Sequence, residues 1–341
     1  MDEVDASNFL LEFGADFAFK SMRPPDEAVI EGFIKRARHS AAGPDGLPYG
    51  AWRGALSIGS RILFRVLQEL MLGTRPPEGF NASLGIYPAK GAADDDSDFL
   101  VKRAASDTRP LSCKNCDNKI LAGCVNHVMT PLIAKHADDQ QEGFVKGRQG
   151  LNNVITVDCH SRAVDAAAVS LGPSQVESMP LLLLFDFAAA FPSLAHAFIF
   201  LALKFYDAPL GMYNFFKALY TDNKCYAVFG GVRRFLYDIL CGILQGCPAS
   251  GSLFVLAIDP FLRMLKSKLL GARTKAFADD LATILKELSH TRIARECFDR
   301  FRAVSGMALK PTKCKLLPLG AELTDDHKAR VQSFIESEVP Q

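Results

Sequence analysis

An apolar stretch of 23 residues, LLLLFDFAAAFPSLAHAFIFLAL from Leu181 to Leu203, constrains the fold of this chain more than any other segment. Its length would allow a helix to span a bilayer. However, Asp186 lies inside it, Pro192 interrupts it near the middle, and no cluster of Lys or Arg flanks one side. The stretch therefore predicts a buried strand that ends at Asp186 and a following helix over 194–205, not a membrane span.

Composition narrows the class of protein. The chain has 341 residues, of which 49% are hydrophobic and 23% charged, so it can build a large folded core. Its formal net charge of +1 gives no support for a dedicated electrostatic nucleic-acid binder, but a local basic cleft is compatible with it. The N-terminus shows no secretion-signal pattern, and the nine cysteines are scattered. We expect an intracellular protein, with the nucleus as one candidate compartment, with reduced thiols and no membrane contact. The oligomeric state is left open.

Two adjacent aspartates, Asp279 and Asp280, lie between apolar runs in KAFADDLATIL, residues 275–285. The pattern predicts two strands joined by a turn that carries both carboxylates. Asp-Asp pairs also occur elsewhere in the chain, so the pair and Asp186 by themselves favour ordinary solvated aspartates. The alternative is a metal site, because three carboxylates at neighbouring strand ends repel one another unless cations offset their charge. A pair of Mg²⁺ ions, which prefer oxygen ligands, would do so.

Helices and short strands alternate in no regular order along the rest of the chain. CYAVFGGVRRFLYDI, residues 225–239, is typical of a hairpin that turns at Gly230 and Gly231. Ser112 is a suitable N-cap for a helix that would run to about Ala134. Because no repeated strand–helix–strand pattern is present, the sequence favours an α+β fold over a doubly wound sheet.

Four motifs follow one another in the second half of the chain: FDFAAAFPS, GILQGCPASGSLF, KAFADDLA and SGMALKPTKCKLL. Together they resemble the palm motifs of reverse transcriptases, specifically those of non-LTR (LINE-type) retrotransposons. Four upstream stretches, AAGPDGLPYGAW, IYPAKG, TRPLS with NKILA, and QEGFVKGRQG, resemble the fingers motifs of the same group. Each motif is weak by itself, but eight in the expected order over residues 40–319 form a specific signal.

The resemblance implies a right-hand polymerase fold, in which an antiparallel palm sheet is backed by helices and joined to fingers. It divides the chain into a helical extension (1–39), fingers with part of the palm (40–180), a palm with the catalytic motifs (181–320) and a tail or truncated thumb (321–341). The thumb is expected to be largely absent.

The implied activity is that of an RNA-directed DNA polymerase, which adds dNTPs to a primer 3′-OH by two-metal-ion phosphoryl transfer. Asp186 and Asp279 match the metal ligands of the family, with Asp280 beside them and the Phe187 carbonyl as a further ligand. Lys313 matches a lysine that protonates the leaving pyrophosphate. The implied cofactor is a pair of Mg²⁺ ions, which Mn²⁺ can replace.

Five other positions match residues that contact the incoming nucleotide in this family. Phe191 matches the aromatic residue that packs under the sugar and excludes a 2′-hydroxyl, which favours dNTPs. Gln245 and Gly246 match a loop that touches template and nucleotide, and a glycine lets the backbone approach a ligand closely. Lys90 and Arg109 match fingers residues near the triphosphate and the template.

Arg148 matches a residue near the template, and Lys315 is a further basic candidate for contact with the template or primer. The implied partners are an RNA template, a DNA primer and dNTPs, and no membrane. The alternative is a catalytically inactive retroelement fragment, or an RNA-binding scaffold that keeps the reverse-transcriptase fold.

A rival pattern in the same region suggests zinc. Cys113, Cys116, Cys124 and His127 have the spacing C-x₂-C-x₇-C-x₂-H. On a continuous helix these residues would extend over about 20 Å at about 1.5 Å per residue, too far for one ion. The fingers motif is therefore the preferred interpretation.

Overall fold

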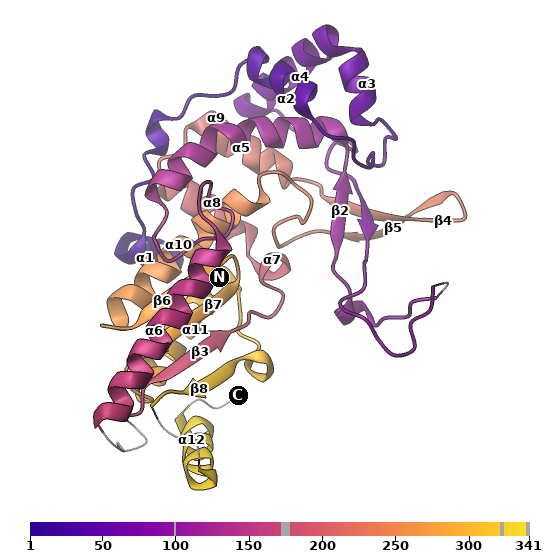
Figure 1. Ribbon diagram of the computed structural model, residues 1–341. Coiled ribbons are helices and arrows are strands. Elements are labelled where there is room, and N and C mark those ends of the chain that lie inside the picture. Colours follow the sequence, from indigo (N-terminus) through magenta and orange to yellow (C-terminus); the bar gives the residue numbers. More distant parts are fainter. Residues whose placement is uncertain (99, 172–177, 321–323, 339–341) are drawn as a thin grey trace. The chain divides into compact units, whose positions relative to one another are not determined.

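The structure is a computed structural model that describes residues 1–98, 100–171, 178–320 and 324–338. The chain folds into two compact units and enters each of them more than once (Figure 1). The first unit comprises Met1–Ala18, Thr130–Tyr206 and Gly251–Gln341, and the second comprises Phe19–Met129 and Asp207–Ser250. Residues 172–177 of the expected fingers segment, and 321–323 and 339–341 of the expected tail, lie outside the described residues.

The first unit contains four strands and most of the long helices. Its strands are β3 (Leu181–Phe185), β6 (Arg273–Phe277), β7 (Asp280–Leu285) and β8 (Lys315–Pro318). Its helices are α1 (Glu3–Phe13), α6 (Gly150–Leu171), α7 (Ala190–Ser193), α8 (His196–Phe205), α10 (Ser250–Lys268), α11 (His290–Ser305), α12 (Asp325–Glu338) and the short 3-10 turn η4 (Pro311–Lys313).

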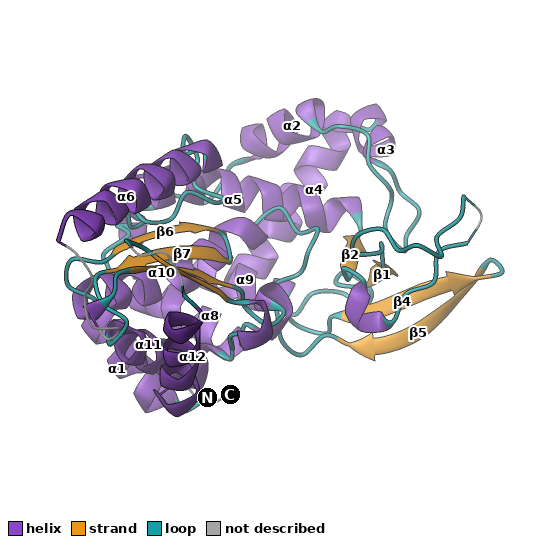
Figure 2. Cartoon of the chain, turned by 60° about the horizontal axis from the view of Figure 1, so that its bottom comes forward, coloured by secondary structure: helices purple, strands orange, loops and turns teal. Residues whose placement is uncertain are grey.

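The four strands form one antiparallel sheet in the order β6-β7-β3-β8. β3 is central because LLLLF is apolar throughout, and it pairs with β7 on one side and β8 on the other. Figure 2 shows α6 lying along β6 and β7, the two strands that it contacts. The sheet therefore brings the expected metal-binding motifs, which are about 90 residues apart in sequence, onto adjacent strands.

A cluster of phenylalanines fills the space between the sheet and its helices. Phe298 of α11 lies 4.6 Å from Phe185 and 4.8 Å from Phe261 of α10, measured between ring centroids. Phe301 stacks on Phe261 at 4.6 Å and lies 6.0 Å from Phe9 of α1. These rings bury large apolar areas, so helices from both ends of the chain contribute to one core.

The second unit combines a smaller sheet with a helical layer. Its strands are β1 (Ser83–Ile86), β2 (Leu111–Lys114), β4 (Lys224–Phe229) and β5 (Val232–Asp238), in the order β2-β1-β4-β5. Its helices are α2 (Glu27–Arg36), α3 (Tyr49–Gly54), α4 (Leu56–Leu72), α9 (Leu210–Leu219), most of α5 (Cys116–His136), and the 3-10 turns η1 (Phe19–Ser21) and η2 (Ala105–Asp107).

A buried lysine ties the small sheet to the loops beside it. Lys114 is 1% exposed, and its ammonium donates to the Asn223 carbonyl oxygen Oδ1 at 2.6 Å and to Asn81 Oδ1 at 3.3 Å. Asn81 in turn donates to the backbone carbonyls of Ala218 and Thr221. Burial lowers the pKa of Lys114 to about 8, and the nearby groups Cys247 and Asp117 offset only part of the loss of water.

The α+β prediction is confirmed, with two four-stranded sheets backed by helices. The predicted strand–helix division of Leu181–Leu203 is found as β3, α7 and α8, and no helix of the described residues is long and apolar enough to cross a membrane. The predicted hairpin around Gly230 is β4–β5.

Two expectations differ from the structure. Ser112 does not cap a helix but lies within β2, and the following helix begins four residues later at Cys116, because residues 111–114 pair with β1. The compact units also cut across the four consecutive segments expected from the sequence, so the assignment of fingers and palm to residue ranges stays a prediction.

The position of α1 in the first unit predicts different costs for two truncations in the same helix. Phe9→Ala should lower the free energy of unfolding by about 3–5 kcal/mol, because Phe9 is fully buried among aromatic rings. Leu11→Ala should cost less than about 0.5 kcal/mol, because Leu11 is 72% exposed. Denaturant unfolding measures the free energy of unfolding of both variants. Equal losses would contradict the packing of α1 into the core.

Candidate active site

Asp186 is held at the end of the central strand of the first unit. It follows β3 directly, and its backbone carbonyl accepts a hydrogen bond from the Lys310 amide at 2.8 Å. Two residues later, the Ala188 amide donates to the Ala308 carbonyl at 2.7 Å. These two bonds lie on either side of the isolated antiparallel bridge between Phe187 and Leu309. The hydrogen bonds of the bridge are therefore made by the neighbours of Phe187, and the bridge does not occupy the Phe187 carbonyl. Asp186 keeps its side chain 37% exposed beyond the sheet.

The two adjacent aspartates lie at the same end of this sheet. β6 and β7 pair from Arg273–Ile284 to Phe277–Asp280, which leaves Ala278 and Asp279 as the turn. Because Phe185 pairs with Leu281, the next step of the antiparallel register places Asp186 across from Asp280. The strand register therefore places Asp186, Asp279 and Asp280 at the same end of the sheet, and their assembly into one site stays a prediction.

Electrostatic repulsion within this group is visible at Asp279. Burial raises the pKa of the Asp279 carboxyl above its ordinary value, and the negative charges of Asp280 and Asp186 raise it further. One cation offsets part of the charge: Lys313 Nζ lies 3.5 Å from Asp186 Oδ2. Lys313 belongs to η4, directly before β8. Its ammonium thus reaches the carboxylate group, and its predicted role toward pyrophosphate stays a prediction.

The donor chemistry of this group suits a hard divalent cation, since carboxylate oxygens are the ligands that Mg²⁺ prefers. The side chains do not converge as a finished ligand set: within the described residues, no group of three or more His, Cys, Asp or Glu is placed to hold a metal ion. Asp279 lies in the turn whereas Asp280 begins β7, and Lys313 already contacts Asp186. The residue types fit a metal site, and the ligand role of Asp186 and Asp279 stays a proposal.

Gln141 clamps the turn that carries Asp279, a contact that sequence reasoning missed. Gln141 is fully buried, and its Oε1 accepts hydrogen bonds from the amides of Ala278 (2.9 Å) and Gly143 (2.8 Å). Its Nε2 donates to the Ala278 carbonyl at 3.2 Å. Ala278 has a φ of +56°, a conformation that costs free energy for a residue with a Cβ and needs such support.

Gly143 completes this clamp through close backbone contact. A Cβ at this position would overlap the Ala278 backbone nitrogen and would lie 2.9 Å from the Phe277 carbonyl carbon. Only glycine therefore lets the loop after α5 lie against the aspartate turn. Gln141 and Gly143 both belong to the motif QEGFVKGRQG, which was the only signal for them in the sequence. The spacing of residues in the motif does not reveal which of them contact the aspartate turn.

Phe191 lies between two other rings. It belongs to α7, is half-buried, and stacks on Phe254 of α10 with a centroid distance of 4.5 Å and an interplanar angle of 5°. The edge of Phe144 meets it at 5.8 Å. Phe144 has a φ of +59°, and a Cβ on Gly251 would approach its ring at 2.8 Å. Phe191 is thus held on one side by packing, and its part in sugar selection stays a prediction.

The two basic residues expected at the template, Arg148 and Lys315, differ in their contacts, and their template role stays a prediction. The Arg148 guanidinium donates to the backbone carbonyls of Asp138 (2.5 Å), Gln141 (2.6 Å) and Ala137 (2.8 Å). These bonds organise the loop that carries Gln141, so the structure gives Arg148 a scaffolding contact. Lys315 begins β8, is exposed, and pairs with Leu184 through the backbone.

The remaining predicted residues all lie in the second unit. Backbone bonds from Lys90 to Asp107 (2.7 Å) and from Arg109 to Pro88 (2.9 Å) bring Lys90 and Arg109 onto facing segments next to the β1–β2 pair. The Gln245 carbonyl accepts from the Ser112 amide at 2.8 Å.

Gly246 has a φ of +115°, and a Cβ there would lie 2.7 Å from the Ser112 carbonyl oxygen. Gly246 thus lies close to the backbone of β2, and its expected close approach to a ligand stays a prediction.

The cysteines of the rival zinc pattern lie on different elements. Cys113 is in β2, whereas Cys116, Cys124 and His127 are on α5. Cys116 and Cys124 are buried, and burial raises the pKa of both thiols. Buried thiols of this kind pack as small apolar groups.

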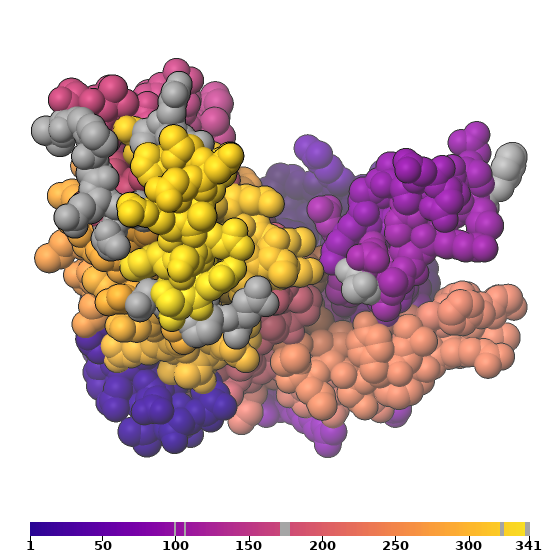
Figure 3. All heavy atoms as spheres, turned by 90° about the horizontal axis from the view of Figure 1, so that it is seen from below, coloured from indigo at the N-terminus to yellow at the C-terminus, as the bar shows by residue number. Residues whose placement is uncertain are grey.

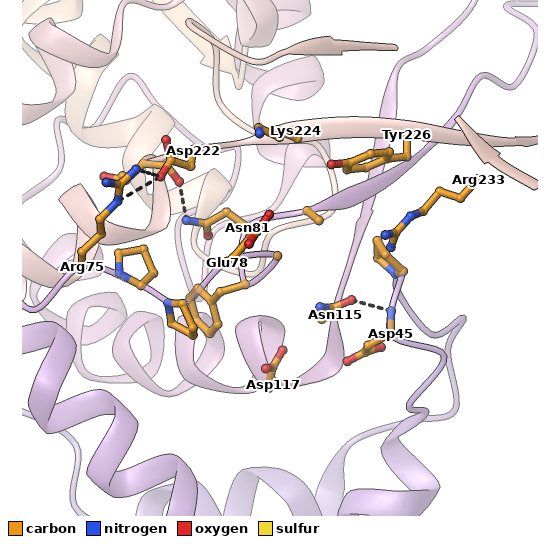
Figure 4. A pocket seen from close by; sticks show the side chains of 17 residues that line it. Asp45, Arg75, Glu78, Asn81, Asn115, Asp117, Asp222, Lys224, Tyr226 and Arg233 are labelled. Atoms are coloured by element: carbon orange, nitrogen blue, oxygen red, sulfur yellow. Dashed lines mark hydrogen bonds and ion pairs between the residues drawn. The ribbon is translucent and has the colours of Figure 1, made fainter. Parts of the chain in front are cut away.

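A cavity of about 880 Å³ lies in the second unit, apart from the predicted site residues (Figure 4). It is lined by both signs of charge, and Arg75 pairs with Asp222 at 2.5 Å on its wall. Burial raises the pKa of Asp117, another lining residue, to about 6. Tyr226 and Arg233 reach it from the β4–β5 hairpin.

Residues 100–329 match the family described as reverse transcriptase (RNA-dependent DNA polymerase). The chain belongs to the reverse transcriptase family. It is 26% identical over 271 residues to the transposon TX1 uncharacterized 149 kDa protein of Xenopus laevis, covering 76% of this chain and 19% of that protein. It is 24% identical over 299 residues to the Pol polyprotein of the type-2 retrotransposable element R2DM of Drosophila melanogaster.

A third relative is the Pol polyprotein of the type-1 retrotransposable element R2 of Nasonia vitripennis, 22% identical over 294 residues. These last two matches each cover 84% of this chain and 26% of the relative. The chain thus spans about a quarter or less of the proteins that it resembles. The predicted kinship with reverse transcriptases of non-LTR retrotransposons is confirmed.

The close packing of the aspartate turn predicts that Gly143 cannot accept even a methyl group. Gly143→Ala should destabilise the reverse transcriptase domain by roughly 1–3 kcal/mol, because either the loop or the Ala278 backbone must shift. Gly50→Ala is the matched control, since Gly50 lies in α3 with no atom near the added Cβ, and it should be neutral or stabilising. Denaturant unfolding separates the two, and a neutral Gly143→Ala would refute the close contact.

Proposed function

We propose that this chain is an RNA-directed DNA polymerase that adds dNTPs to the 3′-OH of a DNA primer annealed to an RNA template. The observation that carries the proposal is the strand register that brings Asp186, Asp279 and Asp280 to one end of a sheet in a member of the reverse transcriptase family. An intracellular location, with the nucleus as one candidate compartment, is part of the proposal.

In this proposal, Asp186 and Asp279 hold Mg²⁺ or Mn²⁺, with Asp280 beside them and the Phe187 carbonyl as a further oxygen ligand. Bound divalent ions supply charge stabilisation for the attacking and leaving oxygens of an in-line displacement. The raised pKa of Asp279 supports the proposal, because burial first, and then the charges of Asp280 and Asp186, disfavour a bare carboxylate that a bound cation would stabilise.

The proposed roles of the other residues follow their positions. Lys313, already next to the Asp186 carboxylate, donates a proton to the leaving pyrophosphate. Lys90 and Arg109 bind the triphosphate, and Gln245 and Gly246 contact the nucleotide and the template. Lys315 binds the phosphates of the primer or template.

A second candidate is a catalytically inactive scaffold of retroelement origin that keeps the fold and binds RNA. It is favoured by two observations: within the described residues no metal-binding group of three side chains is formed, and the ammonium of Lys313 lies beside Asp186. Primer extension with Mg²⁺ or Mn²⁺ distinguishes the two candidates, because the scaffold would extend no primer.

Neutralising one carboxylate should separate catalysis from stability. Asp279→Asn should reduce primer extension on an RNA template by about a thousandfold or more, because it removes a charged ligand. Asp326→Asn, in the exposed Asp-Asp pair of α12, is the matched control and should retain full activity. Similar losses for both variants would contradict the proposed site.

Asp279→Asn should not be less stable than the wild type at neutral pH. Since the pKa of Asp279 is raised in the folded protein, the unfolded chain releases this proton first, and the wild type loses stability as the pH rises above 3.8. Asp279→Asn should therefore match or exceed the wild type at pH 7, and the difference should vanish near pH 3. Thermal unfolding at both pH values measures this, and a less stable variant at pH 7 would assign Asp279 a structural role.

Phe191 should decide between deoxyribose and ribose. Phe191→Val should admit ribonucleotides and keep much of the dNTP activity, because a ring under the sugar excludes the 2′-hydroxyl by steric contact. Phe144→Val is the control, since it removes the neighbouring ring and should leave the ratio of rNTP to dNTP incorporation unchanged. An unchanged ratio in a folded, active Phe191→Val would reduce Phe191 to a packing residue.

A further inference from the structure

Helix α4 of the second unit exposes large apolar side chains along one stripe. Ile58, Ile62 and Leu72 are 61%, 51% and 77% exposed. Arg65 and Glu69, which are also exposed, lie between them. The five positions follow one another at intervals of four, three, four and three residues, which is the spacing of a helix face that packs against a second helix. We call these five residues the α4 stripe.

The fold of the unit uses the other side of this helix. Leu63, Leu67 and Leu70 of α4 are buried, and the helix packs against α2 and α9. The two charged residues of the stripe are also available, because neither Arg65 nor Glu69 forms an ion pair within the described residues. The stripe takes no part in the core, and exposed apolar surface of this kind marks a binding surface.

The β4–β5 hairpin of the same unit also exposes apolar side chains, but it divides them. Figure 3 shows the hairpin, in salmon, at the surface of its unit. Its strand register places Val228 and Phe235 on one face and Phe229 and Val232 on the other. Helix α4 instead gathers its exposed apolar residues on one face, where a single partner can cover them.

The central part of the α4 stripe has the same spacing in both directions. Ile62 precedes Arg65 by three positions, and Leu72 follows Glu69 by three. If two copies of α4 lie antiparallel, this symmetry places Ile62 of each copy against Leu72 of the other, and Arg65 against Glu69. Each contact then occurs twice, as a twofold axis between identical chains requires.

The charges select this direction over the alternative. A parallel pair would place Arg65 against Arg65 and Glu69 against Glu69, and like charges at an interface oppose association. The antiparallel pair matches opposite charges in both central layers. A charged pair inside a helix seam lowers stability relative to apolar residues, but it fixes orientation and register.

We propose that two copies of this chain associate through antiparallel packing of their α4 stripes. The matched segment extends from Ile62 to Leu72, so the interface is smaller than that of a permanent dimer. We therefore expect a reversible dimer with a dissociation constant on the order of 10 μM. The proposal uses only exposed residues of α4 and does not depend on polymerase activity.

A lipid surface is the competing occupant, because an amphipathic helix with arginines can lie on an anionic bilayer. Glu69 opposes this use, since its carboxylate lies within the stripe and would meet the anionic headgroups. A helix of an unrelated protein could cover Ile62 and Leu72, but it would give no reason for the symmetric spacing. The second copy is therefore the occupant that we test.

Sedimentation equilibrium of the full chain measures the association between about 1 and 100 μM, where a dimer of this affinity forms and dissociates. Ile62→Ser should raise the dissociation constant by about tenfold or more, because each dimer loses two buried isoleucine side chains. Leu11→Ser is the matched control, since Leu11 of α1 is 72% exposed and lies outside the stripe. It should dimerise like the wild type.

Charge reversal tests the antiparallel register. Arg65→Glu should raise the dissociation constant by about tenfold or more, because it places two carboxylates against each other in both central layers. Arg65→Glu/Glu69→Arg should return it to within about threefold of the wild type, since opposite charges face each other again. Lys217→Glu makes the same change of charge at an exposed position of α9 and should have no effect.

A mixture of the Arg65→Glu and Glu69→Arg variants provides a second test of the charge pairing. The two variants should form a mixed dimer that neither forms alone at the same concentration. This result is independent of Ile62→Ser, so it also decides the question if that variant proves less stable in thermal unfolding.

A wild type that stays monomeric at about 100 μM would overturn the proposal. So would a dimer that Ile62→Ser and Arg65→Glu leave unchanged, since the interface would then lie elsewhere on the chain. Binding of a monomeric wild type to phosphatidylcholine–phosphatidylserine vesicles, lost in Ile62→Ser, would instead identify the α4 stripe as a lipid-binding surface. Primer extension is not the readout, so an inactive polymerase would leave the result of this experiment standing.

Discussion

The register between β3 and β7 is the constraint on which the candidate active site depends. Five consecutive pairs from Leu181–Leu285 to Phe185–Leu281 fix it, and a slip of one residue would turn every side chain of one strand to the opposite face. The register is secure because Leu181 and Leu183 are buried and Phe185, on the same face, packs against Phe298. Apolar packing thus determines where three charged side chains lie.

The negative charges of these three carboxylates repel one another. Burial and the neighbouring carboxylates both disfavour the charged form of Asp279, and the ammonium of Lys313 relieves the repulsion only at Asp186. The fold tolerates this cost because Gln141 and Gly143 hold the Ala278–Asp279 turn from the outside. Stability at this point comes from hydrogen bonds to the backbone of the turn, not from the aspartates themselves.

Patterns that are local in sequence predicted much of this structure. An apolar run that ends at Asp186 gave the central strand, and Asp-Asp between apolar runs gave the β6–β7 turn. Order of motifs identified the family. One expectation failed because of a contact between distant segments: Ser112 has the chemistry of a helix cap, but pairing with β1 places it in a strand. Three backbone carbonyls bind the Arg148 guanidinium, a contact that the motif did not predict, and the role of Arg148 near the template stays a prediction.

The clamp on the aspartate turn also has a consequence for how the domain can be divided. Gln141 and the carbonyls that bind Arg148 precede the first palm motif by about 40 residues, yet they fix the turn that follows β6. A fragment that begins at β3 would retain all three aspartates and lose the groups that shape their turn. The smallest piece that preserves this geometry must therefore start before Ala137, and Phe9 in the aromatic core extends that requirement to α1.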